Sequence, residues 1–257
     1  MSTVEVDRLG RFPFNLGKSR PKPRLNDTVV FTHIPKTAGM SLGELIRNNI
    51  APERLLELYT ADSRDRLSSL SPEQVRALDA IMGHIPFSFL SSIDLVKPAL
   101  ALTVLRDPVE RIISFYTHAR RNPDHYLHEA VTEGGVTLQE MVRQGMTLEC
   151  DNLQVRYLCS ADLSGVPVGS CSDAMLDDAI NMLSERFAVV GIVEHFVETV
   201  ELVCDVCHWK RTKMHWVNVS PQREIADAAA LEAIRDANQL DIKLYLYALQ
   251  LFQKRMG

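Results

Sequence analysis

Three short segments of this 257-residue chain carry side chains that could hold an anion and accept a proton. Lys36 stands three residues before Gly39, His84 follows a glycine, and Arg106 precedes an Asp-Pro pair. Lysine and arginine bind phosphate and sulfate groups, whereas a neutral imidazole accepts a proton near pH 7. These residue types predict chemistry on an anionic substrate, with His84 as the general base.

The segment around Lys36 is typical of a strand, a tight loop and a helix. Residues 28–32 are β-branched or apolar, and Thr37, Gly39 and Ser41 follow in the loop and at the helix start. The first N–H groups of a helix lack intrahelical partners and the helix dipole is positive there, so this arrangement can cradle a phosphate. We expect the cradle to consist of Lys36, Thr37, Ala38, Gly39, Met40 and Ser41.

The order of lysine and glycine separates this loop from the phosphate loop of common ATPases. That loop, GxxxxGK followed by Ser or Thr, places its lysine directly after a glycine, whereas Lys36 precedes Gly39. An ATP-dependent small-molecule kinase is therefore a weaker interpretation, and a non-catalytic nucleotide-binding protein is another. For this segment taken alone, Lys36 could also be an ordinary solvated side chain.

The segment around Arg106 repeats the strand-to-helix pattern. Residues 100–105 are apolar and predict a buried strand, Asp107 suits a helix N-cap, and Pro108 suits the first helical position. Arg106 is left at the carboxyl end of the strand. Ser114 lies about two helical turns after the cap on nearly the same side, so Arg106 and Ser114 could converge on one anion.

Two residues of these segments could have a purely structural role. Arg111 could be a surface ion-pair partner. His84 follows the short apolar run 81–83, and a histidine after a strand is often only structural. Its position between two anion-binding segments favours the catalytic interpretation.

Two of the segments resemble motifs of known sulfotransferases. The run 33–42, HIPKTAGMSL, resembles the 5′-phosphosulfate loop of the sulfotransferases related to the Golgi heparan sulfate 2-O- and 6-O-sulfotransferases. The run 106–116 looks like their 3′-phosphate motif, and His84 lies in a segment similar to the one that supplies the catalytic histidine of the 2-O branch. Met40 replaces a common hydroxyl residue, and Met82 replaces a second histidine.

The resemblance implies a soluble, bacterial-type sulfotransferase that uses 3′-phosphoadenosine 5′-phosphosulfate (PAPS) and releases the bisphosphate PAP. The cradle would bind the 5′-phosphate, and Arg106 and Ser114 would bind the 3′-phosphate. Lys36 would neutralise the charge on the leaving oxygen. His84 would take the proton of an acceptor hydroxyl lying in line with the sulfur, and no metal is expected.

Weaker similarities imply further contacts and leave the acceptor open. Ser220 lies in a run similar to a loop near the nucleotide in relatives, so we expect it to contact the cofactor. Asn152 and Arg156 could line the acceptor cleft, or they could belong to a solvated helix face. The C-terminal pattern Asp241-x-x-x-Tyr245 also matches the family. The acceptor could be a glycan or another molecule with a hydroxyl group.

Alternation of apolar runs and helical patterns predicts an α/β fold with three layers, in which helices flank a central, mostly parallel sheet. We expect residues 1–26 to be an irregular arm and residues 27–257 to be a single domain. Additional strands are expected at 55–59 and 187–193, and helices at 72–78, 173–186 and 240–252.

Composition limits the partners and the location of the chain. A net charge of −5 argues against nucleic acid as a partner, because duplex binding needs a basic surface. No run of about eighteen apolar residues and no signal peptide is evident, so we expect a cytoplasmic protein without a membrane span. The five cysteines form no framework, and Cys204-x-x-Cys207-His208 is interpreted as ordinary helix residues rather than a haem site.

Overall fold

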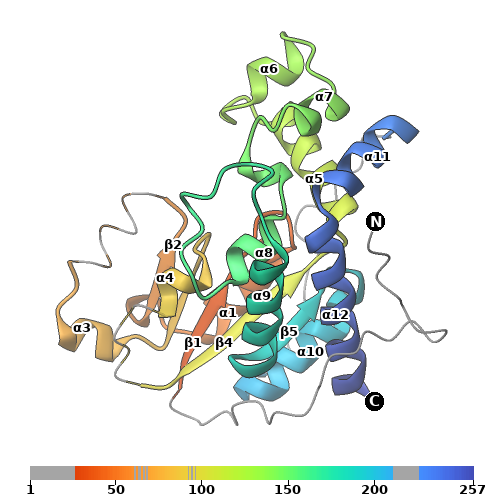
Figure 1. Cartoon of the computed structure of the whole chain (residues 1–257). Coiled ribbons are helices and arrows are strands. Elements are labelled where there is room, and N and C mark those ends of the chain that lie inside the picture. Colours follow the sequence, from red (N-terminus) through yellow and green to blue (C-terminus); the bar gives the residue numbers. More distant parts are fainter. Residues whose placement is uncertain are drawn as a thin grey trace.

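A five-stranded sheet forms the centre of the computed structural model, which describes residues 27–60, 62, 65, 67, 69–91, 93, 95, 97–210 and 226–257 (Figure 1). The strands are β1 (Thr28–Thr32), β2 (Leu55–Leu58), β3 (Ala80–Gly83), β4 (Ala99–Leu105) and β5 (Phe187–Ile192). They lie in the order β2-β3-β1-β4-β5, and every neighbouring pair is parallel. The predicted α/β class and parallel sheet are confirmed.

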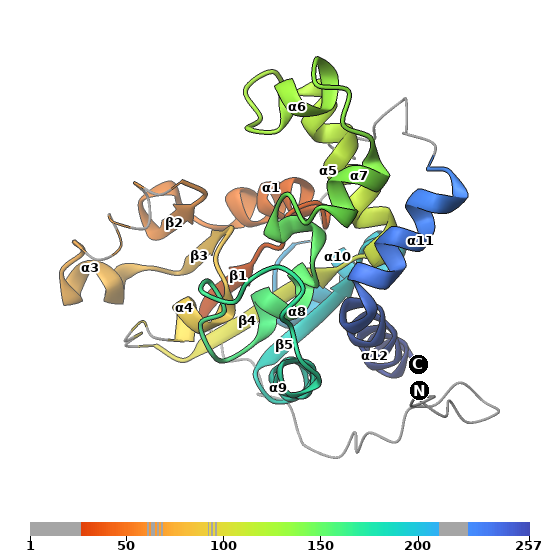
Figure 2. The same ribbon diagram turned by 45° about the horizontal axis from the view of Figure 1, so that its top comes forward.

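Helices lie on both faces of this sheet. The first half of the chain contributes α1 (Gly39–Asn49), η1 (Pro52–Arg54), α3 (Pro72–Ala77), α4 (Phe87–Ser91), α5 (Pro108–Arg121), α6 (His128–Thr132) and α7 (Leu138–Arg143). The second half contributes η2 (Leu148–Cys150), α8 (Leu153–Leu158), α9 (Asp173–Glu185), η3 (Val193–His195), α10 (Phe196–Cys207), α11 (Ala228–Ala237) and α12 (Gln239–Met256). Figure 2 shows α1 and α10 on one face and α8, α9 and α12 on the other, which gives the predicted three layers.

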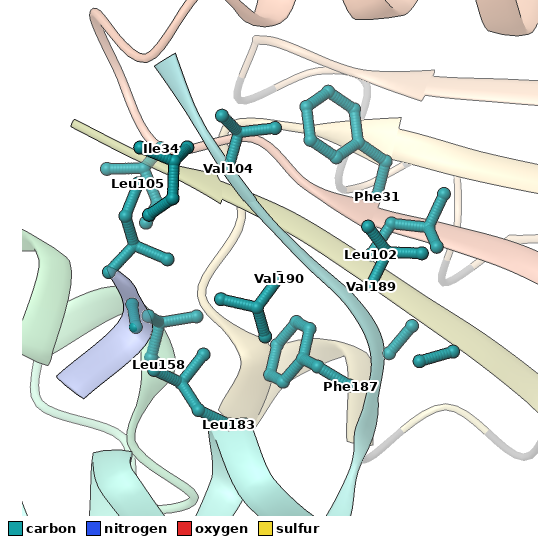
Figure 3. Packing of buried hydrophobic residues seen from close by; sticks show 14 of the residues in the cluster. Phe31, Ile34, Leu102, Val104, Leu105, Leu158, Leu183, Phe187, Val189 and Val190 are labelled. Carbon is teal, nitrogen blue, oxygen red and sulfur yellow. The ribbon is translucent and has the colours of Figure 1, made fainter. Parts of the chain in front are cut away.

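The strands are buried because their sequences are almost continuously apolar, as expected for a parallel sheet covered on both faces. Every residue of β1, β3 and β5 is buried. Phe31, Leu102, Phe187 and Val189 from three adjacent strands belong to one cluster with Leu183 of α9, which Figure 3 shows from close by. This packed centre fixes the positions at which the strands end.

A smaller group of helices, α5, α6, α7 and α11, projects beyond the carboxyl end of β4 (Figure 1). Their apolar side chains form a second cluster, which includes Ile112, Phe115, Met141 and Ile234. Because this cluster packs on itself, it holds α5 at the end of the sheet where polar residues follow the strands.

The remaining expectations about local structure are confirmed where the chain is described. The predicted helices at 72–78, 173–186 and 240–252 correspond to α3, α9 and α12. None of the helices in this part of the chain is both long and apolar enough to cross a membrane. The expected arm, residues 1–26, lies outside the described residues, and the cytoplasmic location stays a prediction.

Candidate functional site

The sheet order places the three predicted chemical residues at neighbouring strand ends. β1 lies between β3 and β4, and Thr32 of β1 is in register with both Gly83 and Thr103. Lys36, His84 and Arg106 follow these three strands in the chain. Ligands of open α/β sheets bind where the carboxyl ends of strands meet at such a switch in strand order. The structure therefore gathers at one edge residues that lie up to 70 positions apart in sequence.

The loop after β1 turns tightly through unusual backbone conformations. Lys36 has φ = 70° and Ala38 has φ = 58°, both in the left-handed region. One guanidinium nitrogen of Arg106, Nη1, donates to the carbonyl oxygen of Lys36 at 3.2 Å. The Thr37 hydroxyl donates to the carbonyl oxygen of Ile34 at 2.8 Å. This hydroxyl group therefore stabilises the loop instead of donating to an anion.

Helix α1 begins at Gly39, where there is no room for a side chain. A Cβ atom at this position would lie 1.9 Å from the His33 ring. Met40 is half exposed, whereas Ser41 is buried. The N–H of Ser41 donates to the Ala38 carbonyl oxygen at 3.2 Å. The N–H groups of Gly39 and Met40 precede this first hydrogen bond of the helix, so the start of α1 can offer them to an anion.

Lys36 lies in a partly buried position beside a second cation. Burial and the nearby Arg106 charge lower the pKa of Lys36 to about 8, and the Glu149 carboxylate opposes this shift. The alternative that Lys36 is an ordinary solvated side chain therefore does not hold. Two cations held close together without full hydration favour an anionic ligand, because its charge would stabilise both.

Arg111 differs from the prediction of a surface ion pair. Its side chain is fully buried, its Nη1 lies 3.3 Å from Glu149 Oε2, and its Nη2 donates to the Glu149 carbonyl oxygen. Burial raises the pKa of the Glu149 carboxyl, and the Arg111 charge opposes that shift. This alternative does not hold, because the face of α5 that carries Arg111 is covered by η2, which lies 38 residues further along the chain.

The geometry of His84 identifies which ring nitrogen carries the proton. His84 Nδ1 lies 3.0 Å from the carbonyl oxygen of His33, and because a carbonyl oxygen can only accept, Nδ1 carries the proton. The lone pair of a neutral His84 ring is therefore on Nε2. A fixed tautomer of this kind is what a general base requires.

Two rings that sequence reasoning did not single out surround His84. The His33 ring lies 4.3 Å from the His84 ring between centroids, and Tyr59 meets His84 edge-on at 5.0 Å. Burial and the neighbouring His84 lower the pKa of His33 well below its usual range, and burial raises the pKa of Tyr59 to about 12. Both rings are neutral at pH 7. His33 lay inside the recognised motif, but its type alone gave no sign that it packs between Gly39 and His84.

Neither interpretation of Asn152 and Arg156 is correct. Both side chains are buried, and Asn152 starts α8 in a left-handed conformation with φ = 46°. Arg156 pairs with Asp151 and donates to the carbonyl oxygens of Val166 and Pro167. These residues hold loops together instead of lining a cleft or facing solvent.

A cleft of about 1030 Å³ opens at the start of α5, and its lining includes Asp107, the residue after Arg106, but neither Arg106 nor Ser114. Ser114, the other predicted 3′-phosphate ligand, is half-buried on α5 immediately after a residue of the cleft wall. Ser220 lies outside the described residues. The cleft is lined by Asp107, Val109, Glu110, Ile113, Glu194, Ala226, Leu231, Arg235, Ile242 and Tyr245.

A group of aromatic and imidazole rings, here called the ring cluster, consists of His118, His125 and Tyr126. His125 stacks on Tyr126 with 4.6 Å between centroids and meets His118 edge-on at 5.5 Å. Tyr126 is 67% exposed. Burial lowers the pKa of both imidazoles, and the charge of Lys36 adds to that shift. No motif in the sequence indicated the ring cluster.

The comparisons agree with the recognised motifs. The model of the Sulfotransferase family matches residues 25–248. Heparan-sulfate 6-O-sulfotransferase 1 of Homo sapiens is 24% identical over 275 residues, covering 90% of this chain and 66% of that protein. Heparan sulfate 2-O-sulfotransferase 1 of Cricetulus griseus is 24% identical over 192 residues, covering 68% of this chain and 53% of that protein.

A solved structure gives a weaker likeness. The crystal structure of mouse sulfotransferase SULT7A1 complexed with PAP has a TM-score of 0.42 and 12% identity, over 85% of this chain and 65% of that chain. The chain spans between about half and two thirds of the length of the relatives just described. Because the family model matches most of its residues, the chain belongs to the sulfotransferase family.

Proposed function

We propose that this protein transfers a sulfuryl group from PAPS to a hydroxyl group of an acceptor. The observation that carries the proposal is the meeting of Lys36, Arg106 and His84 at the ends of three adjacent strands. In the reaction, a bond forms between the acceptor oxygen and sulfur, and the bond from sulfur to the bridging phosphate oxygen breaks. PAP leaves with the bonding electrons, and the hydroxyl proton is transferred to the base.

Each residue has a role that its surroundings support. The N–H groups at the start of α1 would bind the 5′-phosphate, and Lys36 would stabilise the negative charge that develops on the leaving oxygen. His84 would accept the proton on Nε2, because its Nδ1 is committed to the His33 carbonyl. Arg106, together with Ser114, would bind the 3′-phosphate at the mouth of the cleft, and the cleft would hold adenosine.

The acceptor would lie against the ring cluster, where Tyr126 is exposed. Flat ring faces pack against the apolar faces of sugars, and imidazole and phenol groups add hydrogen bonds. The relatives are named for action on heparan sulfate, so we propose a glycan as the acceptor class. We also propose that residues 27–257 form a single catalytic domain, because one continuous sheet carries all of these residues.

Removal of the ring cluster should separate acceptor binding from chemistry. His125→Ala and Tyr126→Ala should each raise the acceptor KM by about five- to tenfold, because each removes one stacking surface. The affinity for PAP should stay unchanged in both variants. Steady-state kinetics with desulfated heparan sulfate fragments and titration with PAP would measure the two quantities. An unchanged KM in both variants would place the acceptor elsewhere.

The donor site is tested by thermal unfolding in the presence of nucleotides. PAP should raise the Tm strongly, 5′-AMP should do so less, and ATP with magnesium should have little effect, because only PAP has phosphates for both anion sites. A ligand at about a hundred times its Kd adds roughly 2.7 kcal/mol to the free energy of unfolding.

The matched control for this experiment is Arg106→Ala. This variant should lose the preference for PAP over 5′-AMP while still responding to the 5′-phosphate. A larger shift with ATP and magnesium than with PAP would support a kinase, which the family match does not favour. Tight PAP binding without transfer to any acceptor would instead indicate a non-catalytic nucleotide-binding protein.

A further inference from the structure

Two chains of hydrogen bonds connect helix α12 with the backbone on either side of Arg106. In the first chain, the side-chain amide of Gln154 accepts from Arg106 N at 3.0 Å and donates to Arg106 O at 3.0 Å. Gln154 is fully buried, and its own backbone N–H donates to Asp241 Oδ2 of α12 at 3.0 Å. The other oxygen of Asp241 accepts from Val155 N at 2.8 Å. Gln154 is thus held by α12 at its backbone and holds Arg106 with its side chain.

The second chain reaches the next residue from the other side. Glu194, which follows β5 in the short helix η3, accepts from Asp107 N through Oε1 at 3.1 Å. Its second oxygen, Oε2, accepts from the hydroxyl of Tyr245 at 3.0 Å. Both carboxylate oxygens of Glu194 are therefore engaged, one by the backbone beside Arg106 and the other by α12.

The two chains start from one face of α12. Asp241 and Tyr245 are four residues apart, and side chains at this spacing lie one above the other on a helix. This pair is the Asp-x-x-x-Tyr pattern at the end of the sequence, which the proposed transfer reaction does not explain by itself. Through Gln154 and Glu194, the two residues of this pattern act on the peptide groups on either side of Arg106. Both chains meet at the peptide group that joins Arg106 to the next residue.

The segment that is held in this way connects β4 to α5 and carries the Arg106 side chain. The Arg106 guanidinium donates to the Lys36 carbonyl and lies 3.9 Å from the Glu110 carboxylate. Its direction depends on the backbone of this two-residue connection, which belongs to neither regular element. A shift or rotation of that backbone would move the guanidinium away from the β1 loop.

We propose that Gln154, Glu194 and Tyr245 are positioning residues that fix the direction of Arg106 and thereby set the affinity for the 3′-phosphate of the donor nucleotide. The proposal rests on the proposed function, in which Arg106 binds that phosphate. The C-terminal helix, which is far from the cradle in sequence, then contributes to nucleotide selectivity. Asp241 acts one step further away, through Gln154.

The test compares Tyr245→Phe with the matched control Tyr247→Phe. Each variant loses a single hydroxyl group from α12, but the Tyr247 hydroxyl is hydrogen-bonded to Ser184 of α9 rather than to Glu194. The measured quantity is the ratio of the Kd of 5′-AMP to the Kd of PAP. Tyr245 and Glu194 also line the cleft, but a direct contact with adenosine would affect both nucleotides equally and cancel in this ratio.

We expect Tyr245→Phe and Gln154→Met each to lower this ratio about five-fold, which corresponds to the loss of one hydrogen bond. Tyr247→Phe should leave the ratio unchanged. A double variant of Tyr245→Phe with Glu194→Ala should lose no more than Glu194→Ala alone, because Tyr245 acts through Glu194. If Gln154→Met does not fold, the Tyr245 and Glu194 variants still test whether these residues set the affinity for the 3′-phosphate.

Two outcomes would overturn the inference, and they differ from failure of the proposed function. An unchanged ratio in Tyr245→Phe and Glu194→Ala, or an equal fall in Tyr247→Phe, would show that these residues only stabilise the fold. If the unmodified protein shows no preference for PAP over 5′-AMP, the two-phosphate site itself is wrong. The unmodified protein is therefore measured first.

Discussion

Lys36→Ala is expected to lower kcat by about a thousandfold while the protein stays folded. Lys36 lies next to the helix start that would bind the 5′-phosphate, and it is the cation expected to meet charge developing on the leaving oxygen. Loss of one preorganised group of this kind typically costs 10²- to 10³-fold in rate, roughly 3–4 kcal/mol of transition-state stabilisation. Single-turnover transfer from PAPS to a glycan acceptor would measure it.

The pH dependence provides a specific control for this role. The pKa of Lys36 is lowered to about 8 by burial and by Arg106, so the side chain is charged below that pH and neutral above it. We therefore expect kcat/KM, which reports the free enzyme, to fall as the pH rises through about 8. Lys36→Arg should be less active but should lack this limb, because arginine stays protonated. If kcat/KM of Lys36→Arg also falls as the pH rises through about 8, the fall is due to the titration of another group.

His84→Ala is expected to lower kcat by about 10²- to 10⁴-fold, the range for removal of a general base. Its affinity for PAP should be nearly unchanged, because the base acts on the acceptor and not on the nucleotide. Added imidazole should restore part of the rate by occupying the space that the side chain leaves. The measurement is the transfer rate with and without imidazole, at constant pH.

The control for His84 is a histidine that lies outside the proposed donor site and the ring cluster. His208 is exposed at the carboxyl end of α10 in a left-handed conformation that asparagine tolerates, so His208→Asn should retain the rate of the unmodified protein. Full activity in His84→Ala would remove His84 as the base. A loss of both activity and thermal stability, without rescue by imidazole, would instead assign it a structural role.

The strand ends and the helix start at Asp107 could be predicted from the sequence because they depend on local chemistry. Asp107 Oδ1 accepts from the backbone N–H of Glu110 at 3.0 Å, as the N-cap prediction requires. The positions of Lys36 and Arg106 at strand ends followed from apolar runs with a polar residue directly after them. Neighbouring strands in a parallel sheet then brought the residues together.

The residues that were missed or misassigned depend on partners far along the chain. A surface position for Arg111 stayed open as an alternative because no local pattern reveals Glu149, its partner 38 residues later. Asn152 was interpreted as a helix-face residue, whereas its side chain accepts from the backbone of Asp241, 89 residues away. These contacts depend on tertiary structure, which periodicity and motifs do not encode.

The central place of β1 in the strand order has a consequence for how the site comes into existence. The hydrogen bond from Arg106 to Lys36 spans 70 residues, and it joins the segments that follow β4 and β1, so it depends on the pairing of these two strands. Contacts of such sequence separation form slowly during folding. We therefore expect the proposed donor site to be completed late in folding, when two strands that are separated by about 70 residues of chain have paired.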